Sequence, residues 1–186
     1  MSDIKPWKTL QTDVVYENES FKINKEVCQL PDGMILQNYF VREGKDVVLI
    51  FCVNKSGEVV LVKQFRQGIK EITLELPGGY VERHDINPTE AARRELLEET
   101  GYSSEVMEEI ANWAISPAGT SNRVRVFFAP DAEKVSAPQF VVGEVTETHV
   151  VRPDVLLQMI SSGEINSLPQ VAGIYRGLSR LGPALK

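Results

Sequence analysis

The sequence contains only two cysteines and two histidines, and no apolar run approaches the roughly 20 residues that span a bilayer. Cys28 and Cys52 stand alone between apolar neighbours, without the CxxC or Cys/His spacing of a zinc site. Two buried, reduced thiols are therefore favoured over a disulfide. His84 and His149 are equally isolated, so we expect surface or capping roles for them rather than a metal site.

Positive charge is also scarce, because 26 acidic residues outnumber 20 lysines and arginines and give a formal net charge of -6. This balance argues against a nucleic acid as the main partner, since phosphate backbones usually bind a basic surface. The opening stretch MSDIKPWKTL has no apolar segment of the signal-peptide kind. We therefore expect a cytoplasmic protein that does not enter a membrane.

The composition that remains is typical of a folded globular protein, with 42% hydrophobic and 25% charged residues. The length predicts one domain of ordinary size with a small appendage. We divide the chain into an N-terminal β region, residues 1–45, and a main domain, residues 46–186.

Strands joined by turns are predicted for the first half of the chain. Strand patterns at 21–30 and 34–43 flank a Pro-Asp-Gly turn, and those at 46–54 and 58–65 flank a Lys-Ser-Gly turn. Each pair predicts a hairpin. A short strand then leads into the glycine-rich stretch LELPGG.

The second half alternates helices and strands. Further strands are predicted at 104–115, 123–129 and 148–152, and helices at 153–163 and 169–181, with a long polar segment before residue 148. Together these elements predict an α/β or α+β sandwich in which helices flank a mixed sheet.

A central helix is predicted between Asn87 and Gly101. Asn87 is a suitable N-cap, Pro88 suits the first helical position, and Glu90 stands three residues after the cap, as in a capping box. Gly101 is the matching C-terminal stop.

Three carboxylates, Glu95, Glu98 and Glu99, share one face of this helix, although like charges at this spacing repel by a few tenths of a kcal/mol per pair. An acidic face is by itself usually a solvated surface. Here, however, it follows a glycine turn that permits close approach of a ligand, and clustered acids suit a hard divalent cation. We therefore predict a Mg²⁺ site, with Mn²⁺ as the alternative, in which substrate phosphates complete the shell and Arg94 orients the acids.

The stretch ARRELLEETGY resembles the second half of the Nudix box, G-x5-E-x7-R-E-U-x-E-E-x-G-U, where U is aliphatic or aromatic. The matching residues are Arg94, Glu95, Leu96, Glu98, Glu99, Gly101 and Tyr102. The first half departs from the box, because fourteen residues instead of thirteen separate Gly79 from Arg94. The first glutamate of the box would fall on Asp85 when the spacing is counted forward from Gly79, and on Ile86 when it is counted backward from Arg94. We interpret this as one extra loop residue, with Asp85 as a shorter substitute.

The resemblance implies a Nudix α/β/α sandwich that hydrolyses a nucleoside diphosphate linked to another moiety. It implies that Glu95 and Glu99 are the principal metal ligands, together with the Gly78 carbonyl. Glu98 would be a further ligand or would hold Arg94. We expect both Glu98 and Arg94 to be catalytic residues. The metal would neutralise the diphosphate and help generate the attacking hydroxide.

Features outside the box resemble ADP-ribose pyrophosphatases and related nucleotide-sugar hydrolases. Pro117 lies sixteen residues beyond Gly101, where that group carries a proline, and VKQFR followed by LELPGG is similar to its EQYR and ELPAG run. The resemblance implies that Arg66 binds a phosphate or the terminal ribose, with a surface ion pair as the alternative. It also implies that Glu75 lies close to metal and substrate, with an edge-strand position that has no role as the alternative. The alternatives are an enzyme for dinucleoside polyphosphates or RNA 5′ ends, and a catalytically weak nucleotide-binding module.

Members of this group commonly dimerise through an N-terminal sheet that helps to bind the base. We therefore expect a homodimer formed through residues 1–45. Trp7, Tyr39 and Phe40 are candidates for stacking on the base, with simple packing as the alternative.

The same group often takes its general base from a glutamate on a loop after the box. Glu144 and Glu147 lie in a suitable region, and we prefer Glu147 because it immediately precedes the strand THVV.

Overall fold

The computed structural model describes residues 4–139 and 146–182. The chain divides into two compact units, Met1–Lys45 with Ala114–Arg123 and Asp46–Trp113 with Val124–Lys186. The first boundary falls where the sequence was divided, but the inclusion of Ala114–Arg123 in the first unit was not expected. In the part of the chain that the structure describes, no helix has the length and apolarity needed to cross a membrane.

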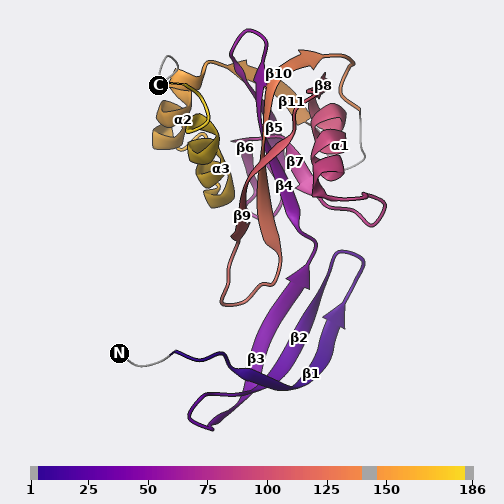
Figure 1. The fold of residues 1–186 in the computed structure, drawn as a ribbon, viewed down its shortest axis with the longest axis vertical. Helices are drawn as coiled ribbons and strands as arrows, with labels where there is room; N and C mark the ends of the chain where they lie inside the picture. Colours follow the sequence, from indigo (N-terminus) through magenta and orange to yellow (C-terminus); the bar gives the residue numbers. More distant parts are fainter. Residues whose placement is uncertain (1–3, 140–145, 183–186) are drawn as a thin grey trace. The chain divides into compact units, whose positions relative to one another are not determined.

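The first unit is an antiparallel sheet with strand order β1-β2-β3 (Figure 1). Its strands are β1 (Lys8–Glu17), β2 (Phe21–Gln29) and β3 (Ile35–Gly44). The predicted β2–β3 hairpin is confirmed, with Gly33 in the left-handed region at φ 90°. Strand β1 was not predicted, and every one of its residues is exposed. Pairing with β2 defines it.

The second unit contains a mixed sheet with strand order β11-β5-β4-β10-β8. Its strands are β4 (Val47–Asn54), β5 (Val59–Arg66), β6 (Glu71–Glu75), β7 (Gly78–Tyr80), β8 (Tyr102–Ser103), β9 (Glu108–Ala114), β10 (Arg123–Lys134) and β11 (Thr146–Val151). Strands β4 and β10 are parallel, whereas β4 pairs antiparallel with β5 and β7. Strand β10 runs past its predicted end at Ala129, because a bulge at Asp131, φ 51°, interrupts the alternation without ending the strand.

Helices cover both faces of this sheet. Helix α1 (Pro88–Thr100) lies on one side, and α2 (Leu156–Ser162) and α3 (Leu168–Leu178) lie on the other, with a short 3₁₀ turn, η1 (Pro153–Val155), before α2 (Figure 1). The predicted α/β/α sandwich with a mixed sheet is therefore confirmed.

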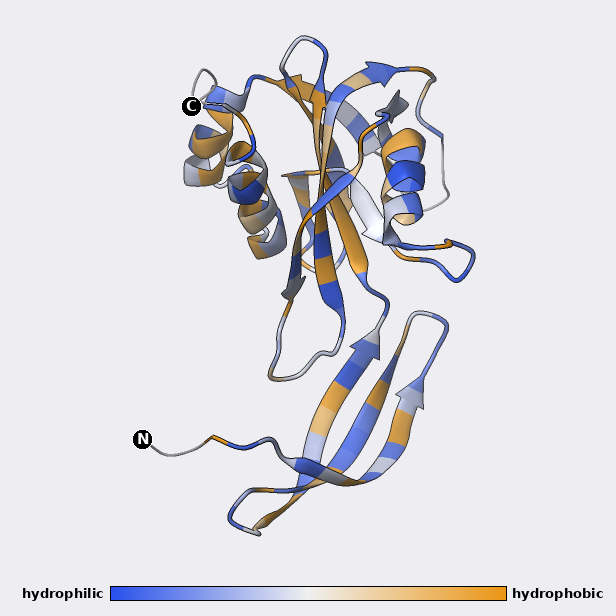
Figure 2. Cartoon of the chain, in the orientation of Figure 1, coloured by the Kyte–Doolittle hydropathy of each residue, from blue (hydrophilic) through white to orange (hydrophobic). Residues whose placement is uncertain are grey.

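The core forms around β4, whose residues are buried on both faces, and apolar residues run along the central strands in Figure 2. Val48, Ile50 and Cys52 pack with Ala91, Ala92 and Leu96 of α1. On the other face, a Cβ at Gly177 of α3 would lie 2.0 Å from the Phe51 ring, so only glycine permits this close approach. Cys28 and Cys52 are buried free thiols, as predicted, and burial raises the pKa of Cys52 to about 12.

Helix α1 has the predicted ends. The Glu90 N–H donates to the Asn87 side chain at 3.0 Å, and Gly101 adopts φ 73° while its N–H donates to the Leu97 carbonyl. These local signals determine which residues the helix presents to β7.

Candidate active site

The acid-bearing face of α1 packs against the backbone of Gly78 and Gly79 in β7. A Cβ at Gly78 would lie 2.1 Å from the Val48 carbonyl oxygen, and a Cβ at Gly79 would lie 2.4 Å from Glu95 Oε1. The Gly78 N–H donates a 2.8 Å hydrogen bond to Glu99 Oε2. Two consecutive glycines are therefore needed for the sheet and the carboxylates to approach this closely.

Two of the three predicted metal-binding carboxylates are buried. Glu95 and Glu99 are each 9% exposed, whereas the Glu98 side chain is 31% exposed. Burying a carboxylate is costly unless hydrogen bonds and opposite charge compensate for the lost hydration. This face of α1 is therefore a built cluster rather than a solvated surface.

Arg94 connects the cluster. Its Nη1 lies 2.9 Å from Glu95 Oε1 and 3.1 Å from Glu98 Oε2, and its Nη2 donates to the Tyr80 carbonyl at 3.1 Å. Hydrogen bonds to Asp85, the charge of Glu95 and hydrogen bonds to Glu95 and Glu98 outweigh the effect of burial and raise the pKa of Arg94 above its ordinary value. The guanidinium therefore stays charged and contacts two of the three acids.

Asp85 is the acid that the irregular loop supplies. Its side chain is 4% exposed and accepts from Arg94 Nε at 3.1 Å, from Arg94 Nη2 at 3.0 Å and from the Glu82 N–H at 2.8 Å. Hydrogen bonding to Arg94 lowers the pKa of Asp85. Ile86, the other position allowed by the spacing, is 89% exposed. Asp85, the position reached by counting forward from Gly79, is therefore the residue that contacts Arg94.

The oxygen donors of this cluster suit a hard divalent cation, although their present arrangement serves hydrogen bonds. Among residues 4–139 and 146–182, no group of three or more His, Cys, Asp or Glu side chains is arranged to hold a metal ion. Asp85, Glu95 and Glu98 share Arg94, and Glu99 accepts from a neutral backbone N–H. Carboxylate oxygens are ligands that Mg²⁺ and Mn²⁺ accept, so the donor set of this cluster fits either ion.

Arg66 and Glu75, predicted separately as substrate-binding residues, form one ion pair. Arg66 Nε donates to Glu75 Oε1 at 2.8 Å and Arg66 Nη2 to Glu75 Oε2 at 2.5 Å, so the fork of the guanidinium holds Glu75. Burial raises the pKa of Glu75, but hydrogen bonds from Arg66, Thr73 and Gln170 outweigh it and leave the pKa lowered. The sequence contained no signal for this pairing.

The predicted residues of the first unit lie on or beside β3. Pro117 belongs to the segment 114–123. Two hydrogen bonds connect this segment to β3: the Tyr39 hydroxyl donates to the Ala118 carbonyl, and the Arg42 N–H donates to the Gly119 carbonyl. The Trp7 and Tyr39 rings meet edge to face at 5.6 Å between centroids, and Phe40 is 51% exposed.

Of the two predicted general bases, Glu147 lies in β11 with a 70% exposed side chain, and its Oε1 is 3.4 Å from His149 Nε2. Glu144 lies outside the described residues.

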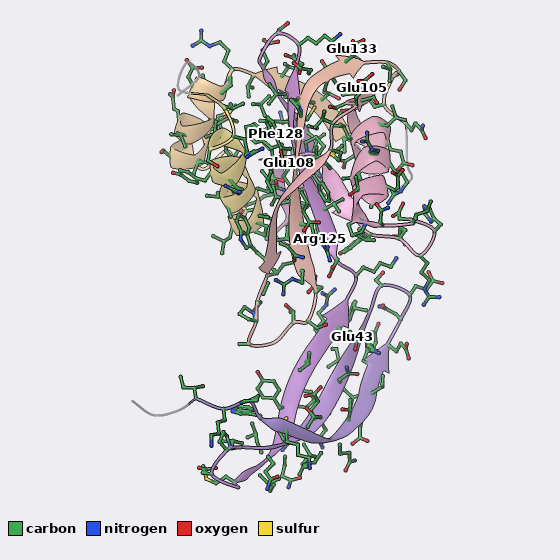
Figure 3. The ribbon with its side chains drawn as sticks, viewed as in Figure 1. Glu43, Glu105, Glu108, Arg125, Phe128 and Glu133 are labelled. Atoms are coloured by element: carbon green, nitrogen blue, oxygen red, sulfur yellow. The ribbon has the colours of Figure 1, made fainter. Side chains whose placement is uncertain are left out.

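Charged residues on β9 and β10 form ion pairs within the second unit. Figure 3 labels two of these residues, Glu108 of β9 and Arg125 of β10. Arg125 lies 3.3 Å from Asp46 and 3.2 Å from Glu109, and Arg180 pairs with Glu108 at 2.5 Å. The Arg180 guanidinium also lies 5.9 Å from the centre of the Phe128 ring. These acids pair with Arg125 and Arg180, whereas the acids on α1 pair with Arg94.

Comparison with known proteins assigns the family. Residues 44–171 match the NUDIX domain model, so the chain belongs to the Nudix family and is a Nudix hydrolase. It is 30% identical over 127 residues, 68% of each chain, to the methanol dehydrogenase activator of Bacillus methanolicus. It is 26% identical over 159 residues, 85% of each chain, to the ADP-ribose pyrophosphatase of Bacillus subtilis (strain 168). The crystal structure of an ADP compounds hydrolase has the same fold, with a TM-score of 0.81 over 96% of both chains at 15% identity.

Replacing Asp85 with Asn should lower the free energy of unfolding by about 2 kcal/mol near neutral pH, because hydrogen bonds between charged groups contribute about 1.5–3 kcal/mol. The folded-state pKa of Asp85 is lowered, so its contribution is complete above the ordinary Asp pKa of about 3.9 and is lost as the pH falls through the lowered pKa. Urea unfolding in metal-free buffer should therefore show a difference between the two proteins that shrinks in acid.

Asp154→Asn is the matched control, because Asp154 pairs with Arg152 on the surface, where both side chains are more than half exposed. Its stability should equal that of the unaltered protein. An Asp85→Asn variant as stable as the control would show that Asp85 does not anchor Arg94.

Proposed function

We propose that this Nudix hydrolase cleaves the diphosphate of ADP-ribose or a related nucleotide sugar, with Mg²⁺, to a nucleoside monophosphate and a sugar phosphate. The observation that carries the proposal is the buried pair Glu95 and Glu99 against the Gly78–Gly79 turn. The substrate class is supported by the similarity to the ADP-ribose pyrophosphatase of Bacillus subtilis, and by Pro117 and the run VKQFR to LELPGG.

The residues that would hold Mg²⁺, or Mn²⁺ in its place, are Glu95, Glu98, Glu99 and the Gly78 carbonyl. When bound, the ion supplies charge neutralisation at the diphosphate and lowers the pKa of water. Arg94 keeps Glu95 and Glu98 oriented toward the site through its hydrogen bonds to both.

On the substrate side, Arg66 binds a phosphate while Glu75 holds its guanidinium. Pro117 contributes to the recognition of the sugar or base. Glu147 accepts a proton from the attacking water, with Glu144 as the alternative base.

Two other functions are less well supported. An enzyme for dinucleoside polyphosphates or RNA 5′ ends would keep the same acidic helix, but the Pro117 region favours nucleotide sugars. A catalytically weak binding module was suggested by the extra residue before the helix. The structure weakens this alternative, because Asp85 still reaches Arg94 with two hydrogen bonds.

The first unit is proposed to form a homodimer. Large apolar side chains between residues 4 and 40 are 38–94% exposed: Ile4, Trp7, Leu10, Val14, Val15, Tyr16, Met34, Ile35, Leu36 and Phe40. Many large exposed apolar side chains in one small sheet are typical of a surface that binds a partner. Base binding by this unit and a cytoplasmic location stay predictions from the sequence.

Incubation with ADP-ribose, GDP-mannose and a dinucleoside polyphosphate in the presence of Mg²⁺ tests the activity. We expect ADP-ribose to be hydrolysed fastest, with AMP and a sugar phosphate as products resolved by ion-exchange chromatography. Chelation should abolish turnover, and added Mg²⁺ or Mn²⁺ should restore it. Absence of turnover with every substrate would rule out the proposed reaction, and calorimetric binding of ADP-ribose under those conditions would favour the binding module.

Replacing Glu99 with Gln should lower kcat by about 10³-fold, equivalent to about 4 kcal/mol of barrier, because the variant loses an anionic oxygen donor at the metal site. Glu90→Gln is the matched control, since Glu90 lies in the first turn of the same helix with a half-exposed side chain. Steady-state kinetics should show no change in this control. Equal activity of both variants would exclude Glu99 as a ligand.

Light scattering of the purified protein should give a mass of twice the 20.8 kDa of one chain. Val14→Asp places a charge on the exposed apolar side of β1, where Val14 is 53% exposed, and should shift the protein toward monomer. Val135→Asp, at a position 59% exposed in the second unit, should leave the mass unchanged. A monomeric unaltered protein would disprove the dimer.

A further inference from the structure

Gln170 is a buried polar residue of α3 that contacts the strand carrying Glu75. It is 3% exposed and forms two hydrogen bonds with residues about ninety positions earlier in the chain. The Leu76 N–H donates to Gln170 Oε1 at 2.9 Å, and Gln170 Nε2 donates to Glu75 Oε2 at 3.0 Å. One side chain thus joins α3 both to the backbone and to the acid of the LELPGG stretch.

Only one orientation of the Gln170 amide satisfies both partners. A backbone N–H can only donate, and an ionised carboxylate can only accept, so rotating the amide by half a turn would break both bonds. The geometry therefore requires a residue that presents an acceptor to Leu76 and a donor to Glu75, and among uncharged side chains of this length glutamine meets the requirement.

The two oxygens of Glu75 are each used twice. Oε1 accepts from Arg66 Nε at 2.8 Å and from Thr73 Oγ1 at 2.6 Å, and Oε2 accepts from Arg66 Nη2 at 2.5 Å and from Gln170. The Glu75 side chain is 4% exposed, whereas that of Arg66 is 46% exposed. The buried acid is thus held by Thr73 and Gln170, and it in turn holds the guanidinium that faces solvent.

We propose that Gln170 is a positioning residue for substrate binding: it fixes the Glu75 carboxylate and, through it, the Arg66 guanidinium that receives the diphosphate. The proposal rests on the function assigned to Arg66 above. It also explains why a polar side chain is buried in α3, since a helix that merely covered the sheet would place an apolar residue there. The same amide holds Leu76, two residues before Gly78, so α3 supports this stretch from the side of the sheet opposite α1 (Figure 1).

Gln170→Ala should raise the KM for ADP-ribose about tenfold and change kcat by less than about threefold, because a pre-oriented Arg66 binds phosphate alike in the ground and transition states. Leu168→Ala is the control on the same helix, at a residue 75% exposed. Its kinetic constants should match those of the unaltered protein. An unchanged KM in Gln170→Ala would overturn the proposal.

A double-mutant cycle separates positioning from general destabilisation. If Gln170 acts through Arg66, then adding Gln170→Ala to Arg66→Ala should raise KM by no more than about twofold further, because the group being positioned is already absent. A full tenfold rise in the Arg66→Ala background would show that Gln170 acts elsewhere, and would overturn the proposal.

Gln170→Glu provides a variant that keeps the size and fold should the alanine variant unfold. When ionised, its carboxylate repels that of Glu75 and can no longer donate a hydrogen bond to it. When protonated, it can accept from Leu76 and donate to Glu75 as the amide does. The KM ratio of this variant to the unaltered protein should therefore fall toward one as the pH is lowered, and a ratio that stays well above one at every pH would contradict the proposal.

Solvent exchange of the Arg66 Nε–H and the Leu76 amide, measured by NMR, is a readout that requires no substrate. Both protons should exchange faster in Gln170→Ala than in Leu168→Ala. If the unaltered protein hydrolyses no nucleotide sugar, the proposed function fails while this measurement still decides whether Gln170 positions Arg66. Unchanged exchange of Arg66 would overturn the positioning role in either case.

Discussion

The hydrogen bond from the Gly78 N–H to Glu99 is the contact on which the site depends, because it joins the acid-bearing helix to the glycine turn. It requires β7 to pair with β4 so closely that a Cβ at Gly78 would meet the Val48 carbonyl. It also requires α1 to begin and end where it does, since a shift of one residue rotates a helix by about 100° and would turn the acids away. Strand pairing and helix capping thus jointly position the carboxylates.

Collecting acids against a buried turn is unfavourable unless cations and donors accompany them. Arg94 meets this requirement on the helix itself, and Asp85 holds Arg94 from the preceding loop. The extra loop residue is tolerated because Asp85 follows the forward spacing from Gly79 and the additional residue, Ile86, is left exposed. The buried Glu75 is compensated in the same way, by the positive charge of Arg66 and by a hydrogen bond from the neutral Gln170 of α3.

Much of the fold and of the acidic cluster was predictable from local patterns. The caps at Asn87 and Gly101, the helical spacing of the acids, and the turns between β2 and β3 and between β4 and β5 are encoded within a few residues of one another. Strand β1 was not predicted, and the length of β10 was underestimated because a bulge interrupts its alternation. The bulge shifts which side chains share a face, so the pattern breaks although the strand continues.

The sequence by itself determined the helix, its acidic face and the family resemblance, because each depends on spacing along one short stretch of chain. Only the tertiary structure decided that Asp85 rather than Ile86 supports Arg94, that Arg66 pairs with Glu75, and that Gln170 completes this pair. These contacts join residues from 9 to 95 positions apart. Their partners are chosen by the packing of strands and helices, and no pattern in the intervening residues specifies them.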